Sequence, residues 1–301
     1  NAKGEISSLS RKVKPDIAVI ATISEGHIEF FNSVEEIANA KCEIFDGMDI
    51  HNGVAIINRD MDVYQHCVDN ISSAKLQKIR TFGTNDASDV QLTMCDALDD
   101  NTTRLVYQVY GEDVEIAIND VISTHLAENL ASIFTVIIEL KLDIESSFVV
   151  MSQIESIKGR GKIENVLYND KSCKVICDYY NSNPQSLRAS LLHLAQFAID
   201  KKIVVLGDMG ELGKASLELH KKMIPYINQS GASMVLLVGK FMCNLRNSFF
   251  GNTLVRCYDD VDQLIANMDD YIKGKEMILI KGSRAMNLDK LAKHLGVKDV
   301  L

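Results

Sequence analysis

The second half of the sequence alternates short, largely apolar segments with longer amphipathic ones. The apolar segments lie at residues 174–178, 203–206, 234–238 and 277–280, and the amphipathic ones lie at 184–199, 216–227, 261–272 and 287–295. Segments of the first kind suit buried strands, and those of the second kind suit helices with one apolar face. Apolar strands that alternate with helices are typical of a parallel sheet covered on both faces. We therefore expect an α/β domain in this half.

The first half predicts a second α/β unit, with a mostly parallel sheet and a β-hairpin region. We expect strands at 17–21 and 53–58, a mostly β pattern over 78–119 that includes a hairpin turning at Gly111–Glu112, and helices near 4–12, 34–45 and 126–140. Ser33 and Glu36 have the spacing of a capping box for the second helix. A polar stretch around 158–162 separates the two halves. We place the domain boundary near residue 157, which gives domains 1–157 and 158–301.

Composition excludes several classes of partner. The 301 residues carry a net charge of −9 and contain no run rich in Lys and Arg, so we expect no nucleic acid partner. No apolar stretch approaches the ~18 residues of a membrane-spanning helix. Seven cysteines without a C-x-x-C pair are typical of reduced thiols. We therefore expect a cytoplasmic protein.

Lys41 stands out in the first half because it falls on the apolar stripe of the helix expected at 34–45. It is either a lysine that extends along the edge of the stripe to reach water or one that points into a site. An inward ammonium is costly unless it is paired or chemically altered. His27 follows the strand expected at 17–21, at the end of a parallel strand where such sheets place ligands. A structural histidine is the alternative.

Asp178, Tyr180, Asn181 and Asn183 lie between a predicted strand and a predicted helix that begins at Pro184. Such polar groups at a strand's carboxyl end can bind ribose hydroxyls or an amino-acid substrate. Capping of the helix by Asn183 alone explains the segment equally well.

Two further motifs follow predicted strands. Residues 206–213 have the spacing G-x-x-G-x-x-G with two acids where a pyrophosphate would approach, so we reject dinucleotide binding. Lys281-Gly282-Ser283-Arg284 combines two cations and a hydroxyl at a strand end. We favour an anion site there over an ordinary turn.

Taken in order, these motifs resemble those of the Mur ligases. The resemblance covers nearly the whole chain and is carried most clearly by Ala40-Lys41-Cys42-Glu43-Ile44-Phe45, Asp178-x-Tyr180-Asn181-x-Asn183-Pro184-x-Ser186, Leu206-Gly207-Asp208-Met209-x-Glu211-Leu212-Gly213 and Lys281-Gly282-Ser283-Arg284-x-Met286. It implies a central ATPase domain without its start, followed by a Rossmann-like carboxy-terminal domain.

The resemblance also implies a role for each site residue. Lys41 corresponds to a carbamylated lysine that, with His27, holds Mg²⁺ through oxygen and nitrogen ligands. The ATP-binding positions are Asn129, Arg160 and Asp178. The positions facing the other substrates are Tyr180, Asn181, Asn183, Ser283 and Arg284.

The implied activity is ATP-dependent amide bond formation in peptidoglycan precursor synthesis. The branch that the motifs resemble joins D-alanyl-D-alanine to UDP-N-acetylmuramoyl-tripeptide. A carboxylate attacks the γ-phosphate of ATP, and the amine of the dipeptide then displaces phosphate from the acyl phosphate. We expect a monomer.

The resemblance leaves out parts that ligation needs. The family's UDP-sugar domain, phosphate-binding loop and magnesium-binding glutamate lie upstream of the stretch that matches Asn1, and no G-x-x-x-x-G-K-[ST] pattern occurs in the chain. We therefore expect the chain alone to be inactive. Two alternatives stay open: another Mur-type or folylpolyglutamate-type ligase, or a non-catalytic remnant that only binds nucleotide or a partner.

Overall fold

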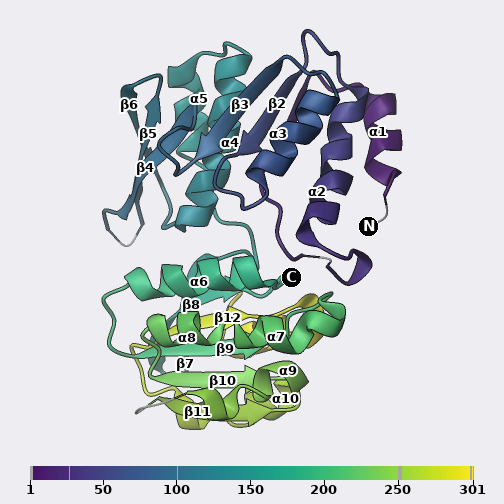
Figure 1. The fold of residues 1–301 in the computed structure, drawn as a ribbon. Coiled ribbons are helices and arrows are strands. Elements are labelled where there is room, and N and C mark those ends of the chain that lie inside the picture. Colours follow the sequence, from purple (N-terminus) through teal and green to yellow (C-terminus); the bar gives the residue numbers. More distant parts are fainter. Residues whose placement is uncertain (1–2, 27, 100, 250–252, 299, 301) are drawn as a thin grey trace. The chain divides into compact units, whose positions relative to one another are not determined.

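The computed structural model describes residues 3–26, 28–99, 101–249, 253–298 and 300. It divides into two compact units, Asn1–Ile154 (unit 1) and Glu155–Leu301 (unit 2), each built on one sheet (Figure 1). The division falls close to the boundary expected near residue 157. In the part of the chain that is described, no helix is long and apolar enough to cross a membrane.

Unit 1 contains a six-stranded mixed sheet with its strands in sequence order. Strands β1 (Ile17–Ile20), β2 (Val54–Asn58), β3 (Lys78–Gly83) and β4 (Val90–Ala97) are parallel neighbours. Strands β5 (Thr103–Val109) and β6 (Glu112–Ile118) continue it as an antiparallel extension. Their hairpin turns at Tyr110 and Gly111, one position earlier than expected. Both residues have positive φ angles, as a tight two-residue hairpin turn requires.

Helices cover both faces of the unit 1 sheet. Helices α4 (Thr124–Glu139) and α5 (Ile144–Met151) pack on one face, and α2 (Val34–Cys42) and α3 (Tyr64–Ser73) pack on the other, while α1 (Glu5–Val13) packs against the turn after α2. Strand β2 is buried at all five positions, since its side chains enter the two cores alternately. Helix α2 is shorter than expected, because a 3₁₀ turn at Glu43–Gly47 replaces its last residues.

Unit 2 contains a six-stranded sheet in the order β11-β10-β9-β12-β8-β7. Its strands are β7 (Lys162–Tyr168), β8 (Lys171–Asp178), β9 (Lys202–Gly207), β10 (Met234–Val238), β11 (Leu254–Tyr258) and β12 (Met277–Lys281). Every pair of neighbours is parallel except the β7–β8 hairpin. The expected parallel α/β architecture is confirmed.

The helices of unit 2 complete its core. One face of the sheet packs against α10 (Val261–Ile265), α11 (Met268–Tyr271) and α12 (Asp289–His294). Helix α6 (Pro184–Gln196) packs against β12 and α8 (Ile224–Gln229). The helix expected at 216–227 is two helices, α7 (Ser216–Lys221) and α8, because Pro225 lacks the N–H that a continuous helix needs. A short helix, α9 (Lys240–Cys243), follows β10.

The strand order of unit 2 reverses beside β9. The chain passes outward through β9, β10 and β11 and then returns to insert β12 between β9 and β8. Ligands of open parallel sheets bind outside the carboxyl ends of the strands at such a reversal. The carboxyl ends of β8, β12 and β9 therefore mark the part of unit 2 where a functional site is expected.

Candidate functional site

The three polar motifs of the second half meet at this carboxyl edge. Lys281, the last residue of β12, pairs in register with Asp178 of β8 on one side and with Leu206 of β9 on the other. The segments 178–183, 207–211 and 281–284 therefore lie side by side, as parallel neighbouring strands require.

A buried ion pair joins two of these segments. The ammonium of Lys281, whose side chain is 2% exposed, lies 3.0 Å from Oδ2 of Asp178 and donates to the carbonyl of Asn181 at 2.9 Å. The hydroxyl of Ser190 donates to the same Asp178 oxygen. Loss of one partner from such a pair typically costs about 3–5 kcal/mol, because the other charge stays buried. Lys281 therefore fixes the end of β8 against the end of β12.

This pairing corrects one prediction about residues 281–284. We favoured an anion site in which Lys281 and Arg284 converge, but Lys281 points into the protein and is neutralised there. Arg284 is exposed and lies 3.3 Å from a carboxylate oxygen of Asp289. Ser283 is buried, and its N–H donates to the carbonyl of Asp208 at 3.0 Å. Of the two cations in this segment, Arg284 is the one that a substrate could reach.

The segment between β8 and α6 is shaped by helix capping. The side-chain oxygen of Asn183 accepts the N–H of Ser186 at 2.8 Å, and the Ser186 hydroxyl accepts the N–H of Asn183 at 3.1 Å. The capping interpretation is confirmed for this residue, while its contact with substrate stays a prediction. Asn181 uses its own side-chain oxygen to accept the N–H of Ser182 at 2.8 Å.

Arg160 and Tyr180 form an exposed stack beside Asp178. The guanidinium carbon of Arg160 lies 4.1 Å from the centre of the Tyr180 ring, a geometry worth about 0.5–1 kcal/mol at an exposed site. Two backbone hydrogen bonds hold the stack in place. The N–H of Tyr180 donates to the carbonyl of Gly159 at 3.0 Å, and the N–H of Gly161 donates to the carbonyl of Cys177 at 2.8 Å. An exposed cation on an aromatic ring next to a carboxylate is suited to a nucleotide.

The segment after β9 packs tightly, and the side chain of Asp208 points toward the protein interior. Asp208 accepts the N–H groups of Phe241 and Met242, at 3.1 and 2.7 Å, so it caps α9. A Cβ atom on Gly239 would lie 2.7 Å from the Asp208 carboxylate. His220 is fully buried and accepts the N–H of Met209 at 2.9 Å. These contacts hold the 207–211 segment rigid beside Ser283.

The remaining predicted site residues lie in unit 1. Lys41 is half-buried on α2, and no hydrogen bond or ion pair of its side-chain amine is found among the described residues. His27 lies outside the described residues. Asn129 is half-buried on α4. Within the described ranges, no group of three or more His, Cys, Asp or Glu side chains is arranged to hold a metal ion.

Sequence reasoning gave no structural role to several residues that build these edges. Ser190 and His220 act through hydrogen bonds that no local pattern reveals. In unit 1, Asp60 accepts the N–H groups of Thr84 and Asn85 at 2.5 and 2.9 Å and so ties the end of β2 to the end of β3. The signal that could have indicated this role of Asp60 is its position just after a buried strand.

Comparisons with known proteins agree with this architecture. A model of the Mur ligase middle domain matches residues 1–137, and a model of the Mur ligase glutamate ligase domain matches residues 163–284. Two α/β units in this order, with motifs at the carboxyl ends of the second sheet, define the class, and the chain belongs to the Mur ligase family.

Two curated relatives of the chain share one name. The chain is 37% identical over 294 residues to the UDP-N-acetylmuramoyl-tripeptide--D-alanyl-D-alanine ligase of Rickettsia prowazekii. The aligned region covers 98% of this chain and 64% of that protein. The chain is 28% identical to the Bacillus subtilis ligase of the same name, covering 98% of this chain and 62% of that protein. The chain thus spans somewhat less than two thirds of these relatives.

Solved structures share the fold. MurF from Acinetobacter baumannii has a TM-score of 0.83 at 23% identity, with 97% of this chain and 62% of that chain covered. The MurF ligase of Thermotoga maritima in complex with ADP has a TM-score of 0.84 at 19% identity, with 98% of this chain and 64% of that chain covered.

Proposed function

We propose that the chain forms part of an ATP-dependent ligase that joins D-alanyl-D-alanine to UDP-N-acetylmuramoyl-tripeptide in peptidoglycan precursor synthesis. The observation that carries the proposal is the 37% identity to the Rickettsia prowazekii ligase over 98% of the chain. Because the chain spans 64% of the length of that relative, the proposal concerns the activity of the complete gene product. We place that gene product in the cytoplasm as a monomer.

The carboxyl edge of unit 2 supplies part of the nucleotide site. Asp178 is 18% exposed and is held from behind by Lys281, so its carboxylate is oriented to accept ribose hydroxyls. Arg160, stacked on Tyr180, is placed to pair with the ribose or phosphate side of ATP. Asn129 is assigned to the adenine. The bound ADP of the Thermotoga maritima ligase supports an adenine nucleotide as the ligand.

The same edge faces the other substrates through Tyr180, Asn181, Asn183, Ser283 and Arg284. The capping bond of Asn183 leaves its amide N–H groups for a substrate carbonyl or carboxylate. Arg284 is exposed and suits the carboxylate of the dipeptide. These residues orient the reactants rather than react themselves.

Lys41 and His27 are assigned to Mg²⁺. Carbon dioxide added to the Lys41 amine gives a carbamate, whose oxygens suit the hard cation. A half-buried lysine with no ion pair in the described structure is compatible with this modification. The metal would neutralise charge on the phosphates. The tripeptide carboxylate attacks the γ-phosphate and releases ADP, and the dipeptide amine then expels phosphate and forms the amide.

The experiment is a phosphate-release assay on the complete gene product that contains this chain. We expect release that needs ATP, Mg²⁺, UDP-N-acetylmuramoyl-tripeptide and D-alanyl-D-alanine together, and little release with single amino acids or folates. Lys41→Ala should lose most activity and regain part of it with added short-chain carboxylates, while Lys12→Ala on exposed α1 should be unaffected. Full activity in Lys41→Ala would refute the carbamate.

The alternatives give different results in this assay. Release driven by a single amino acid or a folate would indicate another ligase of this class. Nucleotide binding without release for any substrate would indicate a non-catalytic remnant. We expect the 301-residue chain alone to release no phosphate, since it contains no G-x-x-x-x-G-K-[ST] loop.

A further inference from the structure

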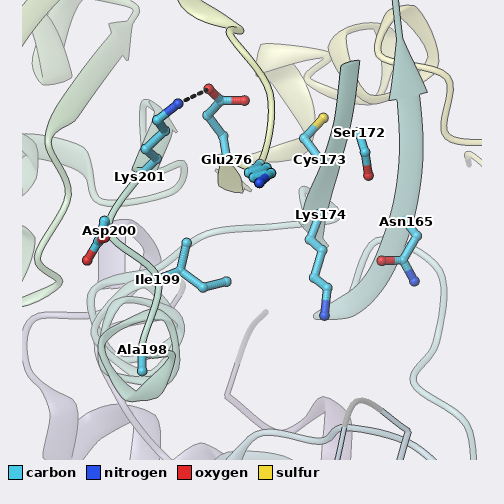
Figure 2. Close-up of a pocket in the computed structure, with 10 residues that line it drawn as sticks. Asn165, Ser172, Cys173, Lys174, Ala198, Ile199, Asp200, Lys201 and Glu276 are labelled. Atoms are coloured by element: carbon cyan, nitrogen blue, oxygen red, sulfur yellow. Dashed lines mark ion pairs between the residues drawn. The ribbon is translucent and has the colours of Figure 1, made fainter. Parts of the chain in front are cut away.

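A pocket of about 470 Å³ opens at the opposite, amino-terminal edge of the unit 2 sheet (Figure 2). It lies where β8, β9 and β12 begin, and none of the residues assigned to the ligase reaction lines it. The five residues of β12 place this pocket roughly 16 Å from the carboxyl edge. Its volume is in the range of small-molecule sites.

The charges around the pocket are mostly positive. Lys174, Lys201 and Lys275 line it together with Asp200 and Glu276, a balance of three positive and two negative charges that gives +1. Glu276 is 4% exposed, and its carboxylate accepts the N–H groups of residues 273 and 274, at 3.0 and 2.8 Å. The Lys201 amine lies 4.0 Å from the same carboxylate. The Glu276 carboxylate is therefore bound by its own loop and lies beside Lys201.

The loop before β12 holds Lys275 in an unusual backbone conformation. Its φ angle is 68°, in the left-handed region that glycine adopts at little cost and that other residues adopt at a cost in free energy. A bond from its N–H to the carbonyl of Ser172, 2.6 Å long, pins the loop to β8. A lysine at this position places an amine on the rim of the pocket.

The opposite wall is apolar. Ala198 and Ile199, in the segment before β9, line the pocket across from Lys174, and Figure 2 shows the side chains of Ile199 and Lys174 extending toward the same space. The net charge of +1 on the residues that line the pocket balances the single negative charge of a monoanion, whereas one of the two charges of a dianion would stay uncompensated. The combination suits a carboxylate with an aliphatic body.

We propose that this pocket binds a small organic monocarboxylate, with its carboxylate beside Lys174 and Lys275 and its aliphatic part on Ile199. Because Lys201 and Lys275 are exposed, the affinity is millimolar and falls with salt. The proposal is independent of the ligase reaction at the other edge.

The test is an NMR titration of the ¹⁵N-labelled chain with butyrate, acetate and inorganic phosphate at constant ionic strength. We expect saturable shifts at the amides of residues 172–174, 199–201 and 275–276. Butyrate should bind up to about tenfold more tightly than acetate, because two more methylene groups are buried. Phosphate should bind more weakly than butyrate.

Two variants and a control make the result decisive. Lys275→Gly removes the amine, and glycine adopts the left-handed backbone conformation of this position at little cost. The variant should bind butyrate at least fivefold more weakly. Ile199→Ala should remove most of the difference between butyrate and acetate. Lys273→Ala, an exposed lysine in the same loop that does not line the pocket, should change nothing. Shifts that do not saturate, that survive Lys275→Gly, or that are matched by phosphate would overturn the proposal.

Discussion

His220 is a fully buried residue whose two ring nitrogens both have partners. Its Nε2 accepts the N–H of Met209 at 2.9 Å, and its Nδ1 donates to the carbonyl of Ser216 at 2.6 Å. The ring is therefore neutral with its proton on Nδ1. Burial lowers the pKa of His220 below the ordinary value of 6.5, and the nearby Asp208 carboxylate, 3.9 Å from Nε2, raises it only in part.

Protonation of His220 should destabilise the native state at acidic pH. Below pH 6.5 the unfolded chain binds a proton at this site that the folded chain does not, so stability falls as pH falls, by at most about 1.4 kcal/mol per pH unit. His220→Gln keeps an acceptor for Met209 but cannot be protonated. Urea unfolding at pH 7, 6 and 5 should show that the wild type loses more stability than the variant.

A pH dependence identical in the two proteins would contradict this assignment. His193 is also buried, with a pKa lowered chiefly by burial, and it remains in both proteins as an internal reference. The comparison therefore isolates the contribution of His220.

Residues differ in how far sequence alone reveals their role. Asp178 was singled out because it is a polar residue at the end of a buried strand; the structure gives it a structural partner in Lys281, and its contact with the nucleotide stays a prediction. Lys281 was assigned to an anion site, yet it is buried and paired with Asp178. Asp178 lies 103 positions earlier in the chain, so no local pattern indicates the pair. Only the strand order, which no local pattern specifies, brings the two together.

At the scale of elements, the start of α6 combines stability with a proposed substrate contact. Asn183 caps the helix, Pro184 occupies its first turn and Ser186 completes the capping box. The cap sets the direction of the helix that follows the candidate site. Its two roles can be separated, because capping needs only a side-chain acceptor.

Asn183→Ala should destabilise the chain by about 1 kcal/mol through loss of the cap, whereas Asn183→Asp should keep nearly all of the stability. In the complete gene product, Asn183→Asp should still raise the KM for a substrate, because it removes the amide donor. Thermal unfolding and ligation kinetics measure the two effects. Equal stability of the Ala and Asp variants would mean that the cap contributes nothing.

Elements with strong patterns were predicted and those with weak patterns were not. Strand β10 was placed without error because it is apolar throughout. Helix α3 was missed because only Cys67 and Ile71 of its ten residues are buried, which gives no clear stripe. Strand β11 was missed because none of its residues is fully buried at the sheet edge.

At the scale of the whole molecule, each unit has its own core. One large apolar cluster of unit 2 runs from Val166 to Val297 and includes residues of five of its strands and three of its helices. In unit 1, apolar clusters on the two faces of the sheet are drawn from residues between Ala18 and Met151. A cluster that is complete within about 150 residues meets the usual requirement for a domain that folds alone.

We therefore expect the fragment Glu155–Leu301 to fold by itself. It should give a dispersed ¹H–¹⁵N spectrum and one cooperative urea transition. The fragment 155–275 is the matched control: it lacks β12, the strand between β9 and β8, so each of these two strands loses its hydrogen-bond partners along one edge in the middle of the sheet, and the fragment should remain unfolded. A collapsed, poorly dispersed spectrum for the longer fragment would show that unit 2 depends on the rest of the chain, even though its cluster is drawn entirely from its own residues.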